Sequence, residues 1–320
     1  MFTIVEPITA DLDVVNSIIH RELHSRVPLV NQIADYIIKS GGKRIRPILL
    51  LLTANACGYR GTYHHLLAAV IELIHTAGLL HDDVVDESSL RRGRQTTNAL
   101  FGNADSVLVG DFVYSRAFQM MASTGNVRVM QIVADTTNMI AEGEVLQSAS
   151  MHNQDLTEER YYQVVHAKTS KLFETSAELG AIIAGASEKE IRACAEYGHS
   201  LGTAFQLVDD MLDYSGSTSD LGKNVGDDLR EGKLTLPLIY LLQHGTPQQT
   251  QLVRIAVENG DASNFDEILT AITKCGALDY TRHHAALAAQ RATSAITALA
   301  NNQFKDSLLK LSAFVVDRNH

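Results

Sequence analysis

The stretch AAVIELIHTAGLLHDDVVD, residues 68–86, runs from a long apolar segment directly into a cluster of carboxylates. Its length and apolar content predict a buried helix. Asp82 and Asp86 are four positions apart and would share one face of that helix, with Asp83 beside them. Carboxylates this close suppress each other's ionisation unless a cation neutralises them. An apolar helix that ends in this way therefore indicates a cation site.

The same pattern occurs a second time, in FQLVDDMLD at residues 205–213. Asp209, Asp210 and Asp213 repeat the spacing of the first motif, and again they follow an apolar helical segment. Two copies make a functional site a better explanation than a pair of solvated acidic helix ends. We expect two related helices that face each other across a bundle.

The chemistry of the ligands favours Mg²⁺. No Cys or His lies in register with the aspartates, and oxygen-only ligands suit Mg²⁺ rather than zinc or copper. Mg²⁺ typically bridges carboxylates to substrate phosphates, and Arg91 and Arg92 could hold phosphate oxygens bidentately. A di-iron bundle is an alternative, since Glu72 and His75 form one Glu-x-x-His fragment, but no second such pair accompanies it.

Further basic residues lie in two loops. SGGKRIRP, residues 40–47, carries Lys43, Arg44 and Arg46 beside two glycines, where backbone can approach a phosphate closely. DLGKNVGDDLREGKLTLP, residues 220–237, adds Lys223 and Lys233. The second stretch alone is typical of a hydrophilic loop, but after an aspartate motif it also suits a lid over phosphates.

Helical periodicity dominates the chain and predicts an all-α bundle. Apolar residues in 16–40 recur mostly three or four apart, with a break at Pro28. Thr157 can cap a helix that would run to about residue 186, with Glu158 and Glu159 complementing the helix dipole. No segment shows period-2 alternation bounded by hairpin turns. Because no linker composition separates two halves, we expect one domain over residues 1–320.

Composition narrows the class of partner and compartment. The net charge of −10 argues against a nucleic-acid-binding protein. Cys57, Cys194 and Cys275 form no CxxC pair and suit a reduced cytoplasmic protein. We expect neither a signal peptide nor a membrane-spanning segment, because the apolar stretches are interrupted by polar residues. These observations argue against insertion into a bilayer but not against peripheral contact with its surface.

Taken in order, the motifs resemble those of the trans-prenyl diphosphate synthases, and the likeness covers nearly the whole chain. FGNADSVLVGDFVYSRAFQMM at 101–121 and IAEGEVLQ at 140–147 are especially similar to the bacterial octaprenyl branch of this family. The other segments that carry the resemblance are GGKRIRP at 41–47, LLHDDVVDESSLRRG at 79–93, AKTSKLF at 167–173, FQLVDDMLDY at 205–214 and GKNVGDDLREGK at 222–233.

The resemblance implies a fold and a set of ligands. The fold would be a large helical bundle around a deep central cavity, usually in a homodimer. About three Mg²⁺ ions would bind per active site. The resemblance assigns metal binding to Asp82, Asp86, Asp209 and Asp213, with Asp83 and Asp210 beside them. The residues that it implies contact the allylic substrate are Arg91, Lys168, Thr169, Gln206, Lys223 and Lys233. The residues that it implies bind isopentenyl diphosphate are Lys43, Arg46, His75 and Arg92.

The resemblance also implies a reaction. An allylic diphosphate, expected to be farnesyl diphosphate, would be extended with isopentenyl diphosphate to an all-trans octaprenyl diphosphate for a quinone side chain. Three alternatives stay open: a synthase of a different product length, a terpene cyclase, and a non-catalytic partner subunit. A cyclase would not need GGKRIRP, and intact motifs oppose an inactive subunit.

Product length is the last expectation. Ala77, Ile74 and Ile71 are spaced by three and would follow one flank of the helix that leads to Asp82. In the family, a bulky aromatic residue at the fifth position before the first aspartate closes the cavity. That position is Ala77 here, so the resemblance implies a cavity that stays open. Close helix packing at Ala77 and Gly78 is the alternative explanation of the small residues.

Overall fold

The computed structural model describes residues 1–215 and 225–318, which are helical apart from turns and one small hairpin. The described residues fall into two compact units that interleave along the chain. The first comprises Met1–Thr136, Leu172–Gly198 and Thr293–Leu311, and the second comprises Thr137–Lys171, His199–Ala292 and Ser312–His320, of which the last two residues are not described. The prediction of one domain stays a prediction.

The first unit contains the N-terminal elements and parts of later helices. Its elements are α1 (Phe2–Val5), η1 (Glu6–Ile8), α2 (Thr9–Glu22), α3 (Pro28–Lys39), α4 (Ile45–Ala56), α5 (Tyr63–Val85), β1 (Leu90–Arg91), β2 (Arg94–Gln95), α6 (Thr97–Phe101), α7 (Asn103–Ala122), the start of α8 (Val127–Ser148), most of α10 (Lys171–Ile183), the start of α11 (Glu188–Ser215) and much of α18 (Gln303–Asp317).

The second unit contains the C-terminal half of α8, the second half of α11 and the elements around them. The additional elements are α9 (Glu158–Val164), η2 (Val165–Ser170), α13 (Asp227–Arg230), α14 (Leu236–His244), α15 (Pro247–Asn259), α16 (Phe265–Cys275), most of α17 (Ala277–Ala295) and the end of α18.

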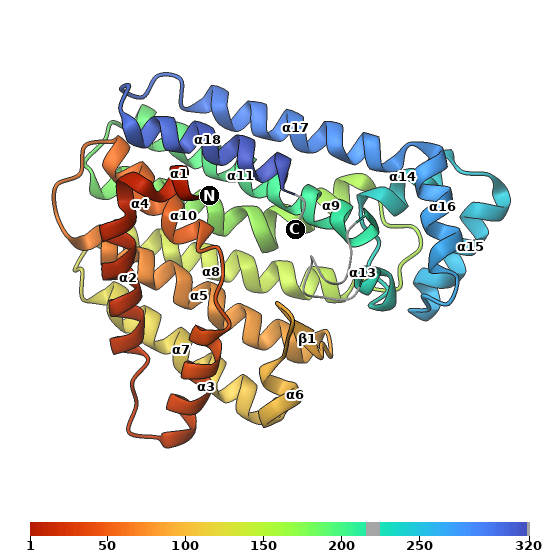
Figure 1. Cartoon of the computed structure of the whole chain (residues 1–320), viewed down its shortest axis with the longest axis horizontal. Helices are drawn as coiled ribbons and strands as arrows, with labels where there is room; N and C mark the ends of the chain where they lie inside the picture. The colour runs from red at the N-terminus through yellow and green to blue at the C-terminus, as the bar shows by residue number, and fades with distance from the viewer. Residues whose placement is uncertain (216–224, 319–320) are drawn as a thin grey trace. The chain divides into compact units, whose positions relative to one another are not determined.

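Helix α5 is the centre of the first unit. It packs along α7 and also contacts α4 and α2 (Figure 1). Leu67, Val70 and Ile71 are fully buried, as the apolar sequence predicts. Among the described residues, α5 is the one helix long and apolar enough to cross a membrane, yet 67% of its apolar window is buried. That burial is typical of a core helix.

The second unit has its own hydrophobic core. Side chains from α9, α11, α14, α15 and α16 form it, and Leu236, Val253 and Ile268 are fully buried within it. Helices α14, α15 and α16 pack on one another (Figure 1). This core supports the half of α11 that carries the second aspartate motif.

The all-α prediction is confirmed, with one local correction. Strands β1 and β2 pair antiparallel through a two-residue turn, Arg92–Gly93, in which both residues have positive φ (54° and 72°). A two-residue turn of this kind is the ordinary hairpin connection. The sequence showed no period-2 alternation here because strands of two residues are too short to display it.

The helical segment after Thr157 is confirmed in part. The Thr157 hydroxyl accepts a hydrogen bond from the Arg160 backbone N–H at 3.2 Å, as its capping position predicts. The segment is not one regular α-helix, however, because Val165–Ser170 adopts a π-helical turn. Such turns occur frequently at functional sites, and this one contains Lys168 and Thr169.

Candidate active site

The first aspartate motif forms the last turn of α5. The backbone N–H of Asp86 donates to the carbonyl of Asp82 at 2.8 Å, which keeps the helical spacing up to the C-cap. Asp82 and Asp86 are half-buried and lie on one face of the turn, whereas Asp83 is only 4% exposed. The flanking aspartates therefore form a pair, and the middle one is directed into the protein.

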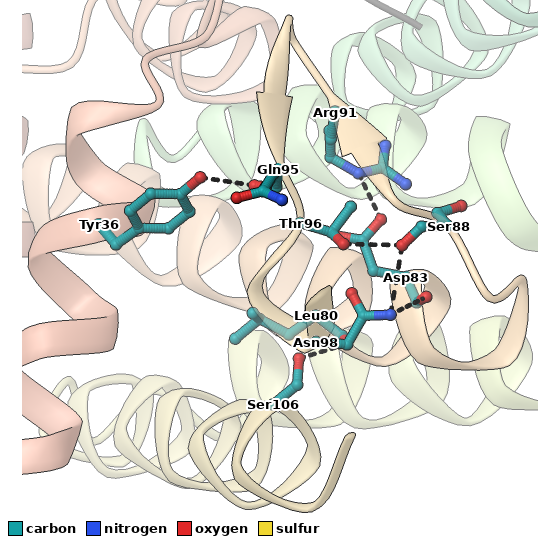
Figure 2. A network of polar contacts seen from close by, with 9 residues as sticks. All are labelled: Tyr36, Leu80, Asp83, Ser88, Arg91, Gln95, Thr96, Asn98 and Ser106. Atoms are coloured by element: carbon teal, nitrogen blue, oxygen red, sulfur yellow. Dashed lines mark hydrogen bonds and ion pairs between the residues drawn. The ribbon is translucent and has the colours of Figure 1, made fainter. Parts of the chain in front are cut away.

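Asp83 anchors the segment that follows the helix (Figure 2). Arg91 Nε donates to Asp83 Oδ1 at 2.7 Å. Asn98 Nδ2 donates to the backbone carbonyls of Asp83 and Ser88, at 3.0 and 3.2 Å. Thr96 Oγ1 donates to the Ser88 carbonyl at 2.7 Å. These bonds satisfy carbonyls at the end of α5 and fix the hairpin against it.

The Asp83–Arg91 contact is an ion pair between a buried carboxylate and a partly exposed guanidinium. Burial raises the pKa of Asp83 above its ordinary 3.8, although Arg91 favours the charged carboxylate. Burial lowers the pKa of Arg91, but Asp83 outweighs it and the net shift is upward. Loss of Arg91 would leave an uncompensated buried carboxylate. The structure thus places Arg91 beside the motif, with its Nε engaged by the protein.

The GGKRIRP loop places its arginines against polar residues of α5. Arg44 forms an ion pair with Glu72, which is 4% exposed. Arg46 Nη1 lies 3.1 Å from His75 Nε2, and its guanidinium stacks 4.5 Å above the Phe173 ring. Lys43 is exposed. Glu72 and His75, the fragment of a di-iron motif, are therefore engaged with arginines.

His75 is neutral in this setting. Burial lowers its pKa well below the ordinary 6.5, and the positive charges of Arg46, Arg92 and the other arginines nearby lower it further. Burial also lowers the pKa of Arg46, to about 10, so Arg46 stays protonated near neutral pH. His75 Nε2 is consequently the acceptor, and Arg46 is the donor. His75 acts here by holding an arginine rather than as a cation itself.

The hairpin turn and the GGKRIRP loop meet at Gly42. Gly42 has φ of +148°, and a Cβ built on it would lie 2.5 Å from Arg92 Nη1. Between the hairpin, the loop and α5 is a pocket of about 60 Å³, whose lining includes Arg44, Glu72 and Arg92. The predicted residues for isopentenyl diphosphate thus lie on adjoining elements of the first unit.

The second aspartate motif is held by a chain of polar contacts within the second unit. Thr169 Oγ1 donates to Gln206 Oε1 at 2.7 Å, and Gln206 Nε2 donates to Asp210 Oδ1 at 2.7 Å. The Tyr161 hydroxyl donates to the other oxygen of Asp210. Asp210 is 2% exposed and Asp213 is fully buried. As in the first motif, the middle aspartate is bound by protein donors.

Charge crowding around Asp210 fits a cation. Burial and the nearby Asp228 carboxylate together raise the pKa of Asp210 to about 7, against the opposing effect of the hydrogen bonds from Tyr161 and Gln206. The backbone N–H of Asp228 lies 3.3 Å from Asp213 Oδ2. Carboxylates gathered at this density need positive charge to ionise together, so the donor set suits a hard divalent cation.

In the second unit, the predicted substrate-binding residues Lys168 and Lys233 each contact acidic or amide side chains of the protein. Lys168 Nζ donates to Glu144 Oε2 and to Gln147 Oε1, both at 2.7 Å. Lys233 pairs with Glu231 at 2.5 Å. Lys223 lies outside the described residues. Glu144 belongs to IAEGEVLQ, a segment that carried the resemblance without an assigned role.

Sequence reasoning missed Tyr161 and Arg318, and it considered Glu72 only as part of a di-iron fragment. Tyr161 precedes the motif by almost fifty positions, and Glu72 looked like an interruption of an apolar helix. Arg318 stacks 3.8 Å above the Phe205 ring, donates to the Phe205 carbonyl at 2.7 Å and lies 3.4 Å from Asp209 Oδ1. Only Glu72 left a signal, as a charge that an apolar helix tolerates only when paired.

The proposed chain-length residues are all buried. Ala77 and Ile71 are 0% exposed, and Ile74 is 4% exposed. A Cβ built on Gly78 would meet no heavy atom within 4 Å among the described residues. Gly78 is therefore not required for close packing, which weakens the packing explanation at that position. The role of Ala77, Ile74 and Ile71 in product length stays a prediction.

Comparisons with known proteins agree with this arrangement. The polyprenyl synthetase family model matches residues 27–274. The chain belongs to the polyprenyl synthetase family. It is 49% identical to octaprenyl diphosphate synthase of Escherichia coli, over 97% of this chain and 96% of that protein. It is 42% identical to a geranyl-diphosphate-specific all-trans-nonaprenyl-diphosphate synthase of Rhodobacter capsulatus, over 98% of this chain and 97% of that protein.

A solved structure is similar over its whole length. Polyprenyl synthase of Caulobacter crescentus, crystallised with calcium and isoprenyl diphosphate, has a TM-score of 0.96 at 40% identity, covering 99% of this chain and 98% of that one. The sequence-based prediction of a prenyltransferase with an all-α fold is thereby confirmed. Members of this family generally depend on Mg²⁺, which fits the oxygen-only donor sets described above.

Proposed function

We propose that the chain extends an allylic diphosphate, preferably farnesyl diphosphate, with isopentenyl diphosphate to all-trans octaprenyl diphosphate, the precursor of a quinone side chain. The observation that carries the proposal is the near full-length similarity to an octaprenyl diphosphate synthase. The two aspartate motifs and their basic partners support it, because they present the donors that a metal-bound diphosphate needs.

About three Mg²⁺ ions, held by Asp82, Asp86, Asp209 and Asp213, would supply the positive charge that stabilises a departing diphosphate. Tyr161 and Gln206 orient Asp210 beside this set, and Arg91 orients Asp83. Residues locked by such hydrogen bonds are pre-organised, so less free energy is spent on ordering them when substrate binds.

The basic residues divide between the two substrates. Arg91, Lys168, Thr169, Gln206, Lys223 and Lys233 would bind the allylic diphosphate, and Lys43, Arg46, His75 and Arg92 would bind isopentenyl diphosphate. Arg46 is a donor near neutral pH, and neutral His75 keeps its guanidinium in place. A rigid guanidinium suits diphosphate because it can bind two oxygens at once.

The reaction then proceeds by ionisation. The allylic C–O bond breaks, the diphosphate takes the electron pair, and the double bond of isopentenyl diphosphate attacks the allylic cation to form the new C–C bond. The attack leaves the positive charge on the other carbon of the former double bond. A proton then leaves the carbon next to that cation, its C–H electron pair forms the new double bond, and the departed diphosphate is the base we propose for the proton. Apolar walls such as those of α5 exclude the water that would quench the cation.

We further propose a cytoplasmic homodimer that meets the membrane only peripherally when the lipophilic product leaves. The burial of most of α5 supports a peripheral rather than a spanning contact, because among the described residues this is the one helix with a spanning composition and it is packed in the core. The net charge of −10 supports the absence of a nucleic-acid partner.

The test is product analysis with purified protein, Mg²⁺, farnesyl diphosphate and labelled isopentenyl diphosphate. Octaprenyl diphosphate as the main product supports the proposal. A main product of another length would show that the chain is a synthase of that length. Nonaprenyl diphosphate is the second candidate, because a nonaprenyl diphosphate synthase is among the relatives. A cyclic hydrocarbon would indicate a terpene cyclase, and no incorporation by folded protein would indicate a partner subunit.

A further inference from the structure

Two histidines and an aspartate converge at the opposite end of α5 from Asp82. His64 and His65 belong to the first turn of α5, and Asp11 belongs to the first turn of α2. His65 Nε2 lies 2.8 Å from Asp11 Oδ1, and His64 Nε2 lies 3.6 Å from the same oxygen. One coordinating atom from each residue lies within 4.8 Å of the other two.

The surroundings hold these side chains in place. The side chains of His64, His65 and Asp11 are 7%, 15% and 26% exposed. The Tyr59 ring packs edge-on against His64, with centroids 5.2 Å apart. Asn55 Nδ2 lies 3.5 Å from the second oxygen of Asp11. The cluster is therefore a packed arrangement at the junction of α2, α4 and α5, with limited access to solvent.

The orientation of the two imidazoles is informative. Consecutive helical residues normally point about 100° apart, yet these two rings lie 3.9 Å apart and both present a nitrogen to one carboxylate. Burial and the neighbouring His65 lower the pKa of His64 more than Asp11 raises it, so the net shift favours the neutral ring. A neutral imidazole is the form that ligates metals.

We propose that Asp11, His64 and His65 form a binding site for a Zn²⁺-class divalent metal ion. Two imidazole nitrogens and one carboxylate oxygen are a common three-residue zinc donor set, with water in the fourth position. Mg²⁺ and Ca²⁺ prefer sites made of oxygen atoms alone, so this site would differ in metal from the aspartate motifs.

The distances suit such an ion after a small adjustment. A tetrahedral zinc with bonds of about 2.0–2.1 Å separates its ligand atoms by about 3.3 Å. The His64–Asp11 separation of 3.6 Å is close to that value. The His65–Asp11 hydrogen bond at 2.8 Å would open by about 0.5 Å as the metal replaces the shared proton.

The site would act on stability rather than on the prenyl transfer. His65 and Asp82 are separated along α5 by about 26 Å at ~1.5 Å per residue. A metal at the cluster would tie the first turn of α2 to the first turn of α5, and a ligand that binds only the folded state stabilises it. The inference does not depend on the proposed product or substrates.

The experiment uses tag-free, full-length protein stripped of metal and kept in saturating Mg²⁺, which occupies the oxygen-only sites. Zn²⁺ binding is measured by calorimetry for the wild type, for the His64→Asn/His65→Asn variant and for a control, His20→Asn, at an exposed histidine of α2. We expect one more Zn²⁺ per chain in the wild type and the control than in the double variant.

Two further measurements keep the test decisive. Co²⁺ should give visible absorption bands of a tetrahedral site in the wild type but not in the double variant. Zn²⁺ near a hundred times its dissociation constant should raise the wild-type Tm by about 3 °C. If the double variant does not fold, Asp11→Asn and His65→Gln serve instead. Equal Zn²⁺ stoichiometry and equal Tm shifts in wild type and folded variants would overturn the proposal, leaving only an Asp11–His65 hydrogen bond.

Discussion

Asp83 and Asp210, the middle residues of the two aspartate motifs, are both held by protein donors. Arg91 binds Asp83, and Tyr161 and Gln206 bind Asp210. In each motif the consecutive aspartates differ in burial, because successive side chains on a helix point to different sides. The middle carboxylate fixes the local structure, and the flanking carboxylates are the proposed metal ligands.

The metal assignment predicts a large loss of activity without a loss of fold. Asp82→Ala and Asp209→Ala should each lower kcat about 100-fold or more, because each removes a carboxylate that holds charge where the diphosphate departs. The far-ultraviolet circular dichroism should stay helical. Asp13→Ala, at an exposed aspartate of α2, is the matched control. Near-wild-type turnover of both variants at saturating Mg²⁺ would contradict the assignment.

The lowered pKa of His75 predicts that the stability of the protein depends on pH. Its pKa lies well below 6.5 in the folded protein, so the unfolded chain takes up a proton that the folded chain does not. Below about pH 6.5 this favours unfolding, by at most about 1.4 kcal/mol per pH unit. His75→Gln keeps an acceptor for Arg46 and removes the titration.

The measurement is Tm as a function of pH between about 5 and 7.5. Wild-type Tm should fall more steeply with decreasing pH than the Tm of His75→Gln, whereas His20→Gln, at an exposed histidine, should follow the wild type. Parallel curves for all three proteins would show that the pKa of His75 is the same in the folded and unfolded states.

At the residue scale, the two aspartate motifs could be recognised in the sequence, but the hydrogen bonds and ion pairs that hold their side chains could not. The predicted placement of Asp82 and Asp86 on one helix face is found in the structure because it requires only a helix of regular pitch, which the chain forms. Tyr161 and Arg318 could not be found in this way, because their contacts depend on how separate elements pack. A hydrogen bond between residues far apart in sequence leaves no local pattern.

At the scale of elements, the hairpin β1–β2 and the GGKRIRP loop depend on one another at Gly42. Because a Cβ there would collide with the Arg92 guanidinium, Gly42→Ala should displace Arg92 and raise the KM for isopentenyl diphosphate about tenfold. The KM for the allylic substrate should change little. Steady-state kinetics with one substrate varied at a time measure both constants.

Gly41→Ala is the control for this prediction. Gly41 also has a positive φ, of +67°, but a Cβ built on it would meet nothing within 4 Å among the described residues. Both variants therefore carry backbone strain, and only Gly42→Ala carries the collision. Equal effects of the two substitutions would assign the change in KM to strain in the loop rather than to Arg92.

Helix α5 carries the prediction on product length. In the proposed function, the stretch from His64 to Asp83 would give a growing tail a wall roughly 30 Å long at ~1.5 Å per residue. Ala77→Tyr should close the cavity and shift products made from farnesyl diphosphate toward geranylgeranyl length while condensation continues. Chromatography of the labelled products measures the shift. A folded, active Ala77→Tyr enzyme with an unchanged long product would show that the tail does not pass Ala77.

Elements were predictable where periodicity was strong and not where they were short. The apolar pattern of α5 and the capping residue Thr157 were sufficient for those helices. The π-helical turn Val165–Ser170 has the same composition as an α-helix, so no sequence signal distinguishes it. The hairpin turn left only Gly93 as a signal, since Arg92 is an uncommon residue at positive φ.

At the scale of the whole molecule, the all-α class followed from helical periodicity along the chain. The division into two units did not follow from the sequence, for a physical reason. Its boundaries after Thr136, Lys171, Gly198, Ala292 and Leu311 fall within helices, where a change of composition or a flexible linker is not expected. Linker-based reasoning detects domains joined end to end rather than interleaved ones.

The proposed cation sites lead to a prediction about the Tm of the whole protein, because a ligand that binds only the folded state raises Tm. Mg²⁺ and inorganic diphosphate together should raise Tm by about 3 °C or more, and each alone should do less, since the metal neutralises the carboxylates only while it bridges them to the anion. Differential scanning fluorimetry of metal-stripped protein measures the shifts. The Asp82→Ala/Asp209→Ala variant should lose the combined effect, whereas Asp13→Ala should keep it. If the motifs were merely solvated helix ends, the combined shift would equal the sum of the separate ones and would persist in the double variant.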